Sequence, residues 1–230
     1  MKNAILMAAG LGTRMRPLTE NMPKPLIKAL GKPLIETIID GLRGADVNKI
    51  YVVTGYLSQK FTYLTNKYDN VVLVENHEYL VKNNISSIYA VRDILRQEDC
   101  YICEADLYIS DPAVFNIPHS KSCYYGKYVA GHSDDWIFEM NGDRITRVKK
   151  GGDDTYNMVG ISFFKKEDAS IIADAIEQAY KEDGCENLFW DEIVDRKLDV
   201  VDLTICPVEK NQITELDTCK ELMEFEETHR

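Results

Sequence analysis

Apolar runs alternate with helical spacings through the first half of the chain. Short apolar runs predict four strands, at Ala4–Ala8, Lys49–Thr54, Val71–Glu75 and Tyr101–Ala105. Between these runs, apolar residues recur every three or four positions and predict helices over Leu34–Leu42, Leu57–Asn66 and Ile85–Leu95. This alternation of strand and helix is typical of a parallel sheet with helices on both faces.

The pattern changes after Ser122, where the segments become short and alternate between apolar and polar residues. Turn residues such as Asn141-Gly142-Asp143 separate them, which predicts an antiparallel excursion from the sheet. Farther on we expect helices over Asp168–Tyr180 and Trp190–Arg196, a strand over Val200–Cys206 and a last helix after Asp217. We therefore expect residues 1–230 to form one domain with a Rossmann-like three-layer α/β/α fold and a mixed, mostly parallel central sheet.

The composition limits the classes of partner. The 230 residues are 45% hydrophobic and carry a net charge of −11, so a nucleic acid, which binds basic surfaces, is not an expected partner. No apolar run approaches the roughly 20 residues that span a bilayer, so we expect no membrane partner and a cytoplasmic protein. Six cysteines include the motif Cys100-x-x-Cys103. On a strand these two positions face opposite sides, so buried, reduced, structural thiols are expected.

One segment contradicts the acidic character of the whole chain. Residues 1–32 contain six Lys or Arg and one acid, a local net charge of +5. Gly10-Leu11-Gly12-Thr13-Arg14 directly follows the first predicted strand, as loops that hold phosphates do. It lacks the Gly-Lys-Ser/Thr of a Walker A loop, and Met15 replaces the third glycine of the dinucleotide fingerprint. With Lys24 fixed between two prolines, the segment suits a polyphosphate; a solvated basic loop is the alternative.

The segment Gly-x-Gly-Thr-Arg-x-Arg-Pro-Leu-Thr over residues 10–19, followed by Pro-Lys-Pro-Leu over residues 23–26, resembles the signature of the sugar-phosphate nucleotidylyltransferases. The resemblance implies that residues 1–230 form one nucleotidyltransferase domain and that Lys24 and Arg14 are catalytic. Arg16 matches the signature without a clear role. The resemblance also implies that the nucleotide is bound by the loop residues Ala8, Ala9, Gly10, Gly12, Thr13 and Arg14.

Two aspartates are the metal ligands that this resemblance implies. Asp106 directly follows the strand Tyr101–Ala105, where α/β enzymes place their ligands, and it would contact the nucleotide as well. Asp217, in the segment Glu215-Leu216-Asp217-Thr218, resembles the second carboxylate of the family, although an Asp before a helix is also an ordinary N-cap. The implied cofactor is Mg²⁺, which one or two carboxylates and substrate phosphates hold in many enzymes.

Within the superfamily, four further segments resemble bacterial CTP:phosphocholine cytidylyltransferases and the related 2-aminoethylphosphonate enzymes. They are Gly55-Tyr56-Leu57, residues 83–89, Asp135-Trp136 and residues 188–191. The resemblance implies a nucleotide site that also includes Gly55, Asn83, Asn84 and Ser86. It implies an acceptor site of Lys24, Asp135, Trp136, Lys150, Trp190 and Asp191. The alternatives are helix capping for Asn84 and Ser87, core packing for each tryptophan, and a surface lysine pair for Lys149 and Lys150.

The expected activity is a Mg²⁺-dependent transfer of CMP from CTP to a small cationic phosphate or phosphonate, with release of pyrophosphate. An aromatic cage would suit the quaternary ammonium of phosphocholine, and carboxylates would suit the primary amine of 2-aminoethylphosphonate; the residues allow both. The expected partners are these small molecules alone. A sugar-1-phosphate nucleotidylyltransferase using UTP or dTTP, and a non-catalytic nucleotide-binding regulatory module, are the alternatives.

Overall fold

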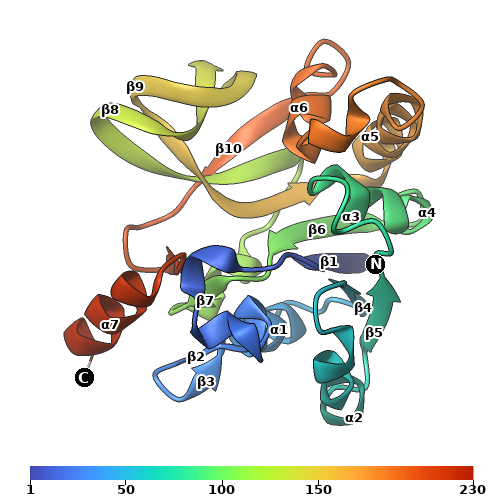
Figure 1. Cartoon of the computed structure of the whole chain (residues 1–230). Coiled ribbons are helices and arrows are strands. Elements are labelled where there is room, and N and C mark those ends of the chain that lie inside the picture. Colours follow the sequence, from blue (N-terminus) through green and yellow to red (C-terminus); the bar gives the residue numbers. More distant parts are fainter. Residues whose placement is uncertain (230) are drawn as a thin grey trace.

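A seven-stranded sheet forms the centre of the computed structural model, which describes residues 1–229 (Figure 1). The strand order is β10-β8-β9-β6-β1-β4-β5. The bounds are β1 Lys2–Ala8, β4 Lys49–Thr54, β5 Val71–Glu75, β6 Asp99–Glu104, β8 Ser122–Asn141, β9 Arg144–Phe164 and β10 Leu203–Pro207. Strands β6, β1, β4 and β5 are parallel, whereas β9 runs antiparallel to β6 and β8. The expected mixed, mostly parallel sheet is confirmed.

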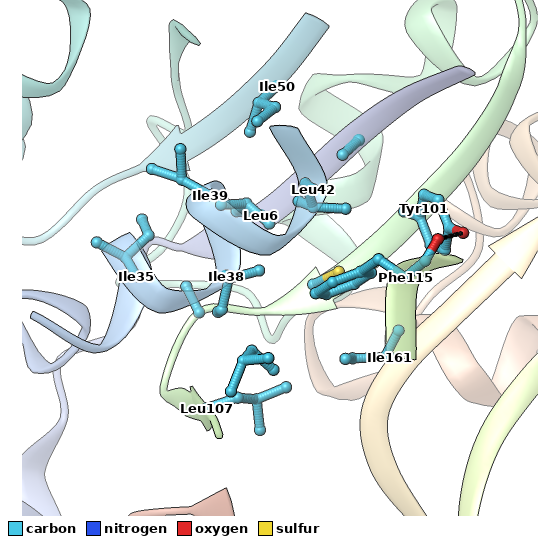
Figure 2. Close-up of a cluster of buried hydrophobic side chains, with 14 of the residues drawn as sticks. Leu6, Ile35, Ile38, Ile39, Leu42, Ile50, Tyr101, Leu107, Phe115 and Ile161 are labelled. Carbon is cyan, nitrogen blue, oxygen red and sulfur yellow. Dashed lines mark hydrogen bonds between the residues drawn. The ribbon is translucent and has the colours of Figure 1, made fainter. Parts of the chain in front are cut away.

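Helices cover both faces of this sheet because successive residues of each strand point to opposite sides. Leu6 of β1 packs with helices α1 (Leu34–Gly44) and α2 (Tyr63–Lys67) on one face, in the core shown in Figure 2. Ile5 packs on the other face, against four helices. These are α3 (Ile85–Ala90), α4 (Arg92–Leu95), α5 (Lys166–Ala179) and α6 (Trp190–Asp195). The three-layer architecture is thereby confirmed.

The cysteine motif follows the same alternation. Cys103 packs in the core on the α1 face and Cys100 in the core on the α5 face, as expected for positions three apart on a strand. All six cysteines of the chain lie in the described part and none forms a disulfide.

The antiparallel excursion is one long hairpin. The short segments predicted after Ser122 form two continuous strands, β8 and β9, which meet at a two-residue turn, Gly142-Asp143. The hairpin curls back on itself, since Ile137 and Phe138 pair with residues 148–149 on one side and 156–157 on the other. Register shifts on both sides of Trp136 mark this curl.

Three predicted elements differ most from the structure. Residues 57–66 divide into a 3-10 helix, Ser58–Phe61, and α2, and residues 85–95 divide at Val91 into α3 and α4. The periodicity predicts a single helix in each case because a 3-10 turn keeps the apolar face nearly in place. The strand expected at 200–206 is β10, with bounds Leu203–Pro207, so it begins three residues later and ends one residue later than predicted.

Several small elements lie near the basic N-terminal segment. Strands β2 (Lys28–Ala29) and β3 (Lys32–Pro33) form a short ribbon, and β7 (Leu107–Ile109) pairs with β11 (Ile213–Glu215). Helix α7 (Cys219–Thr228) packs Leu222 and Phe225 against Met15 of the basic segment. No helix among the described residues is long and apolar enough to cross a membrane.

Candidate active site

A cavity of about 720 Å³ lies beyond the carboxyl ends of β1 and β6. Side chains from residue 7 to residue 221 line it, so both halves of the chain contribute. A second cavity of about 340 Å³ adjoins it, shares Gly10, Arg14, Asp106 and Asp217 with it, and reaches Lys24. The carboxyl ends of parallel strands are where open α/β sheets hold their ligands.

The glycine loop forms one wall of the cavity. Its backbone adopts a conformation that a side chain at Gly12 would disfavour. Gly12 has a φ of +61°, and a Cβ on it would lie 2.9 Å from Cβ of Lys24. The hydroxyl of Thr19 donates to the Gly12 carbonyl at 2.8 Å and holds this turn. At Gly10 a Cβ would meet nothing within 4 Å, so the loop is open toward the cavity there.

Lys24 lies at the centre of a group of charges. Its Nζ is 2.6 Å from Oδ2 of Asp106 and 2.5 Å from Oδ1 of Asp217, while Arg14 Nη1 is 2.7 Å from the other oxygen of Asp217. Burial favours a neutral amine, but the two carboxylates outweigh it and raise the pKa of Lys24 above its usual value. Burial also opposes ionisation of Asp217, and its bonds to Lys24 and Arg14 nevertheless lower the pKa of that carboxyl. The lysine is therefore charged.

The two aspartates meet because of one short strand pair. Strands β7 and β11 are antiparallel, with Leu107 opposite Glu215, and the Leu216 N–H donates to the Asp106 carbonyl, so Asp217, the next residue, lies close to Asp106. Thr218, and not Asp217, is the N-cap of α7: its hydroxyl accepts from the Glu221 N–H at 3.2 Å. The side chain of Asp217 is thus available to the cavity rather than to the helix.

Two further acids, to which the sequence pattern assigns no role, complete the cluster. Oxygens of Glu104, Asp106 and Glu215 lie within 4.8 Å of one another. Burial and the neighbouring carboxylates raise the pKa of Glu104 well above its usual value and that of Glu215 to about 8. Glu104 and Glu215 lie two residues before the predicted metal ligands Asp106 and Asp217. Residues two positions apart on a strand point to the same side of it. That spacing is the signal that could have identified them.

The acidic cluster fits a hard divalent cation. Asp106 Oδ1 is buried and has no hydrogen-bond partner among residues 1–229. An unpaired buried carboxylate oxygen is costly, and oxygens of this kind are the ligands that Mg²⁺ prefers. In this structure the positive charge that balances Asp106 and Asp217 comes from Lys24.

A polar wall lies across the cavity from these acids. The Asn76 amide donates to the hydroxyls of Ser86 and Ser87 at 2.9 and 3.2 Å, and the Ser86 hydroxyl donates to the Asn83 carbonyl. Asn84 Oδ1 accepts from the N–H of Trp190 at 3.0 Å, so its side chain joins α3 to α6 instead of capping its own helix. These bonds fix the side chains before any ligand arrives.

The third wall is aromatic and comes from the β8–β9 hairpin and the start of α6. The rings of Trp136 and Phe189 meet edge to face, with centroids 5.5 Å apart. Lys150 Nζ lies 5.4 Å from the centroid of Trp136 and 5.1 Å from that of Phe189. Asp134 and Asp135 line the cavity beside them.

The cage expected from Trp136, Trp190 and Asp191 does not form. Trp190 is 3% exposed and packs against Tyr124 and Phe164 in the core. Asp191 is equally buried and accepts from the Tyr124 hydroxyl at 3.0 Å, and burial raises its pKa to about 7. Neither lines either cavity. Packing decides this, because the first turn of α6 directs Trp190 into the core and leaves the preceding ring, Phe189, in the cavity.

Most of the other residues predicted for the site lie together. The 720 Å³ cavity is lined by Ala9, Gly10, Arg14, Asn83, Asn84, Ser86, Asp106, Asp135, Trp136, Lys150 and Asp217. The adjoining cavity adds Ala8, Gly12, Thr13 and Lys24. Gly55 lines neither; a Cβ there would lie 2.6 Å from the Tyr79 ring, so this glycine admits the ring to the cavity wall. Lys149 pairs with Glu139 instead of facing the cavity.

Comparison with known proteins identifies relatives of this chain. Residues 3–120 match the family model described as nucleotidyl transferase. The chain is 54% identical over 225 residues to the 2-aminoethylphosphonate cytidylyltransferase of Lancefieldella rimae, covering 97% of this chain and 92% of that protein. It is 33% identical over 225 residues to the choline-phosphate cytidylyltransferase of Streptococcus pneumoniae, covering 97% and 96%.

Solved structures agree. The structure of the CTP:phosphocholine cytidylyltransferase from Streptococcus pneumoniae matches with a TM-score of 0.89 and 32% identity, covering 100% of this chain and 99% of that one. The inositol-1-phosphate CTP transferase from T. maritima matches with a TM-score of 0.78 at 16% identity, covering 99% and 95%, and shares the fold.

Proposed function

The chain belongs to the nucleotidyl transferase family, and from this premise we propose that it transfers CMP from CTP to 2-aminoethylphosphonate, releasing pyrophosphate in a Mg²⁺-dependent reaction. The observation that carries the proposal is the position of Lys24 between Asp106 and Asp217, beside the glycine loop and in the small cavity that adjoins the one with the polar wall. Residues 1–230 are taken as one nucleotidyltransferase domain, since the cavity needs side chains from both halves. A cytoplasmic location fits the six unpaired cysteines.

The reaction needs little apparatus because the acceptor is already an anion. A phosphonate oxygen attacks the α-phosphorus of CTP in line, the bond to the β-phosphate oxygen breaks, and pyrophosphate leaves. No base is required to create the nucleophile, so catalysis consists of alignment and charge neutralisation. Arg14 and the loop N–H groups bind the triphosphate, and Lys24 neutralises the oxygens where the two substrates meet. Asp106 and Asp217 would hold Mg²⁺, which supplies further neutralisation of the phosphates when bound.

The relative at 54% identity acts on 2-aminoethylphosphonate by its name, and one contact in this chain favours the same acceptor. The faces of Trp136 and Phe189 already carry the ammonium group of Lys150. A trimethylammonium group would have to displace that charge to use the same rings. A primary ammonium can instead donate hydrogen bonds to the acids that line the cavity, and Lys150 is then placed to attract the phosphonate.

The cytosine base is assigned to the polar wall. Asn83, Ser86 and Ser87 present amide and hydroxyl groups that can pair with the edge of a pyrimidine. The Asn76 amide donates to both serine hydroxyls, and the Ser86 hydroxyl donates to the Asn83 carbonyl, so little side-chain entropy of the serines is lost when the base binds.

A pyrophosphate-release screen tests the proposal. CTP, UTP, dTTP and ATP are each combined with 2-aminoethylphosphonate, phosphocholine, phosphoethanolamine and glucose-1-phosphate, with and without Mg²⁺. We expect release only with CTP and Mg²⁺, and the highest kcat/KM with 2-aminoethylphosphonate. Activity confined to the hexose phosphate would make the chain a sugar-1-phosphate nucleotidylyltransferase. Binding of CTP without turnover of any acceptor would make it a regulatory module.

A further inference from the structure

Three metal-ligating side chains converge far from the active site. His119, Cys123 and Cys206 present one donor atom each, and these three atoms lie within 4.8 Å of one another. Cys123 pairs with Phe163 across β8 and β9, and Phe163 pairs with Tyr101 near the start of β6. The cluster is therefore near the amino end of β6, while the substrate cavity lies beyond its carboxyl end. The proposed cytidylyl transfer makes no use of it.

The sheet register explains why the thiols meet. Strands β8 and β10 are parallel, with Cys123 opposite Thr204 and Tyr125 opposite Cys206. The two cysteines thus lie diagonally, two residues apart along the strands and on the same face. A diagonal of one strand spacing and two residues separates their Cα atoms by about 8 Å, beyond the roughly 7 Å that a disulfide spans. The two sulfur atoms can therefore bind one ion placed between them more easily than they can form a disulfide.

The imidazole has a defined orientation and tautomer. The Tyr125 hydroxyl donates to the Val114 carbonyl at 2.9 Å, so toward His119 Nε2, 2.9 Å away, it acts as an acceptor. The proton is then on Nε2, and the lone pair of Nδ1 points at Cys123 Sγ, 3.4 Å away. Burial, together with the charge of Lys2, lowers the pKa of His119 to about 4, so the ring is neutral. A hydrogen bond on the second ring nitrogen is the usual support of a metal-bound histidine.

We propose that His119 Nδ1, Cys123 Sγ and Cys206 Sγ form a binding site for a thiophilic divalent cation of the Zn²⁺ type. A tetrahedral zinc ion with ligands about 2.0–2.3 Å away brings its donor atoms within about 4 Å of one another, the scale of this cluster. Both thiols lose a proton on binding, and the resulting charge of Zn²⁺, two thiolates and a neutral imidazole is zero. Cys123 and Cys206 are only 2% and 7% exposed, and a buried site of this kind can hold an assembly without net charge because burying a net charge is costly.

The position of the site assigns it a structural role. Strand β10 is at the edge of the sheet, where five register pairs join it to β8. His119 belongs to the connection that leads into β8. An ion bound by all three residues would tie this connection and the edge strand to the sheet. A cavity of about 350 Å³ is lined by His119 and Phe163 and so reaches the histidine side of the site.

The test uses the full chain, stripped of metal by a chelator under reducing conditions and titrated with Co²⁺. We expect one equivalent to give the ligand-field bands of a tetrahedral ion and a thiolate-to-cobalt charge-transfer band, both abolished by Zn²⁺. A cobalt ion held by the acids of the active site has oxygen ligands and gives no such charge-transfer band. Cys206→Ser should lose the band, while Cys103→Ser, a buried thiol of the same core, should keep it.

Tyr125→Phe provides a finer test, because it removes only the hydroxyl that fixes the ring. It should weaken cobalt binding on the order of 10- to 100-fold. Should a variant fold poorly, the wild-type chain alone decides, since Zn²⁺ must raise its melting temperature with a concentration dependence that follows the Co²⁺ affinity. Spectra without thiolate bands, a band that persists in Cys206→Ser, or isolation of the chain with a Cys123–Cys206 disulfide would each overturn the proposal.

Discussion

Replacing Lys24 by methionine removes one charge and leaves the volume of the side chain nearly unchanged. In the folded chain Lys24 is 7% exposed, and its two partners, at 2.6 and 2.5 Å, have side chains only 23% and 19% exposed. Breaking a buried ion pair by removing one partner costs about 3–5 kcal/mol. Since Arg14 still pairs with Asp217 and the carboxylates are partly hydrated, we expect about 2–3 kcal/mol of unfolding free energy to be lost at pH 7.

The pH dependence of that loss has a definite sign. The pKa of Asp217 is lowered in the folded chain, so its contribution to stability is present above its ordinary value of 3.8 and disappears as the pH falls through the folded value. The pKa of Lys24 is raised, so its contribution is present below 10.5 and disappears as the pH rises through the folded value. The difference between wild type and variant should therefore be largest near neutral pH and vanish in strong acid.

Turnover should fall on the order of 10²- to 10³-fold, as when a single oxyanion donor is removed. Urea denaturation across pH and pyrophosphate release measure the two effects, and Lys28→Met, an exposed lysine on β2, is the matched control. With the lysine gone, Mn²⁺ or Mg²⁺ should stabilise the variant more than the wild type, because no resident cation competes for Asp106 and Asp217. A variant that keeps wild-type turnover, or that gains no more from Mn²⁺ than the wild type does, would refute the assigned role.

The remaining predictions concern three other positions. Gly12→Ala should lower kcat/KM for CTP at least tenfold in steady-state assays, because a Cβ would meet Lys24 at 2.9 Å; Gly31→Ala, also at positive φ but with open space, should leave it unchanged. Lys150→Met should raise KM for 2-aminoethylphosphonate and improve phosphocholine relative to it, by roughly 5- to 30-fold in their ratio, while Lys149→Met should not; an unchanged ratio would contradict the assigned contact. Because the pKa of Asp191 is raised to about 7, wild-type stability relative to Asp191→Asn should fall from about pH 4 to 7 and then level off in urea titrations; a difference independent of pH would contradict this.

Much of the candidate site could be predicted from the sequence because the residues that form it are close together along the chain. The glycines, Arg14 and Lys24 lie within fifteen residues of one another, and a loop that must approach phosphates needs those residue types in that order. The spacing of apolar residues likewise indicates which face of each strand or helix is buried. The sheet and its two helix layers could therefore be predicted from the pattern of apolar positions.

Other features depended on contacts between distant segments. Whether Phe189 or Trp190 enters the cavity is decided by the direction of the first turn of α6, and two adjacent rings give no sequence signal for it. Burial and neighbouring carboxylates raise the pKa values of Glu104 and Glu215, and both causes arise only when β6 and β11 pack into the folded chain. The thiols of Cys123 and Cys206 meet through the register of two strands that are far apart in the chain.

The sequence by itself determined the residue types that can bind a triphosphate and the order of strands and helices, because both depend on short spacings. Only the tertiary structure decided which acids pair with Lys24. It decided that the ring of Phe189, and not that of Trp190, lines the cavity. It also decided that Asp217 serves the cavity and Thr218 caps the helix. Such choices depend on distances of a few ångströms between segments that the chain order leaves unrelated, and packing alone fixes those distances.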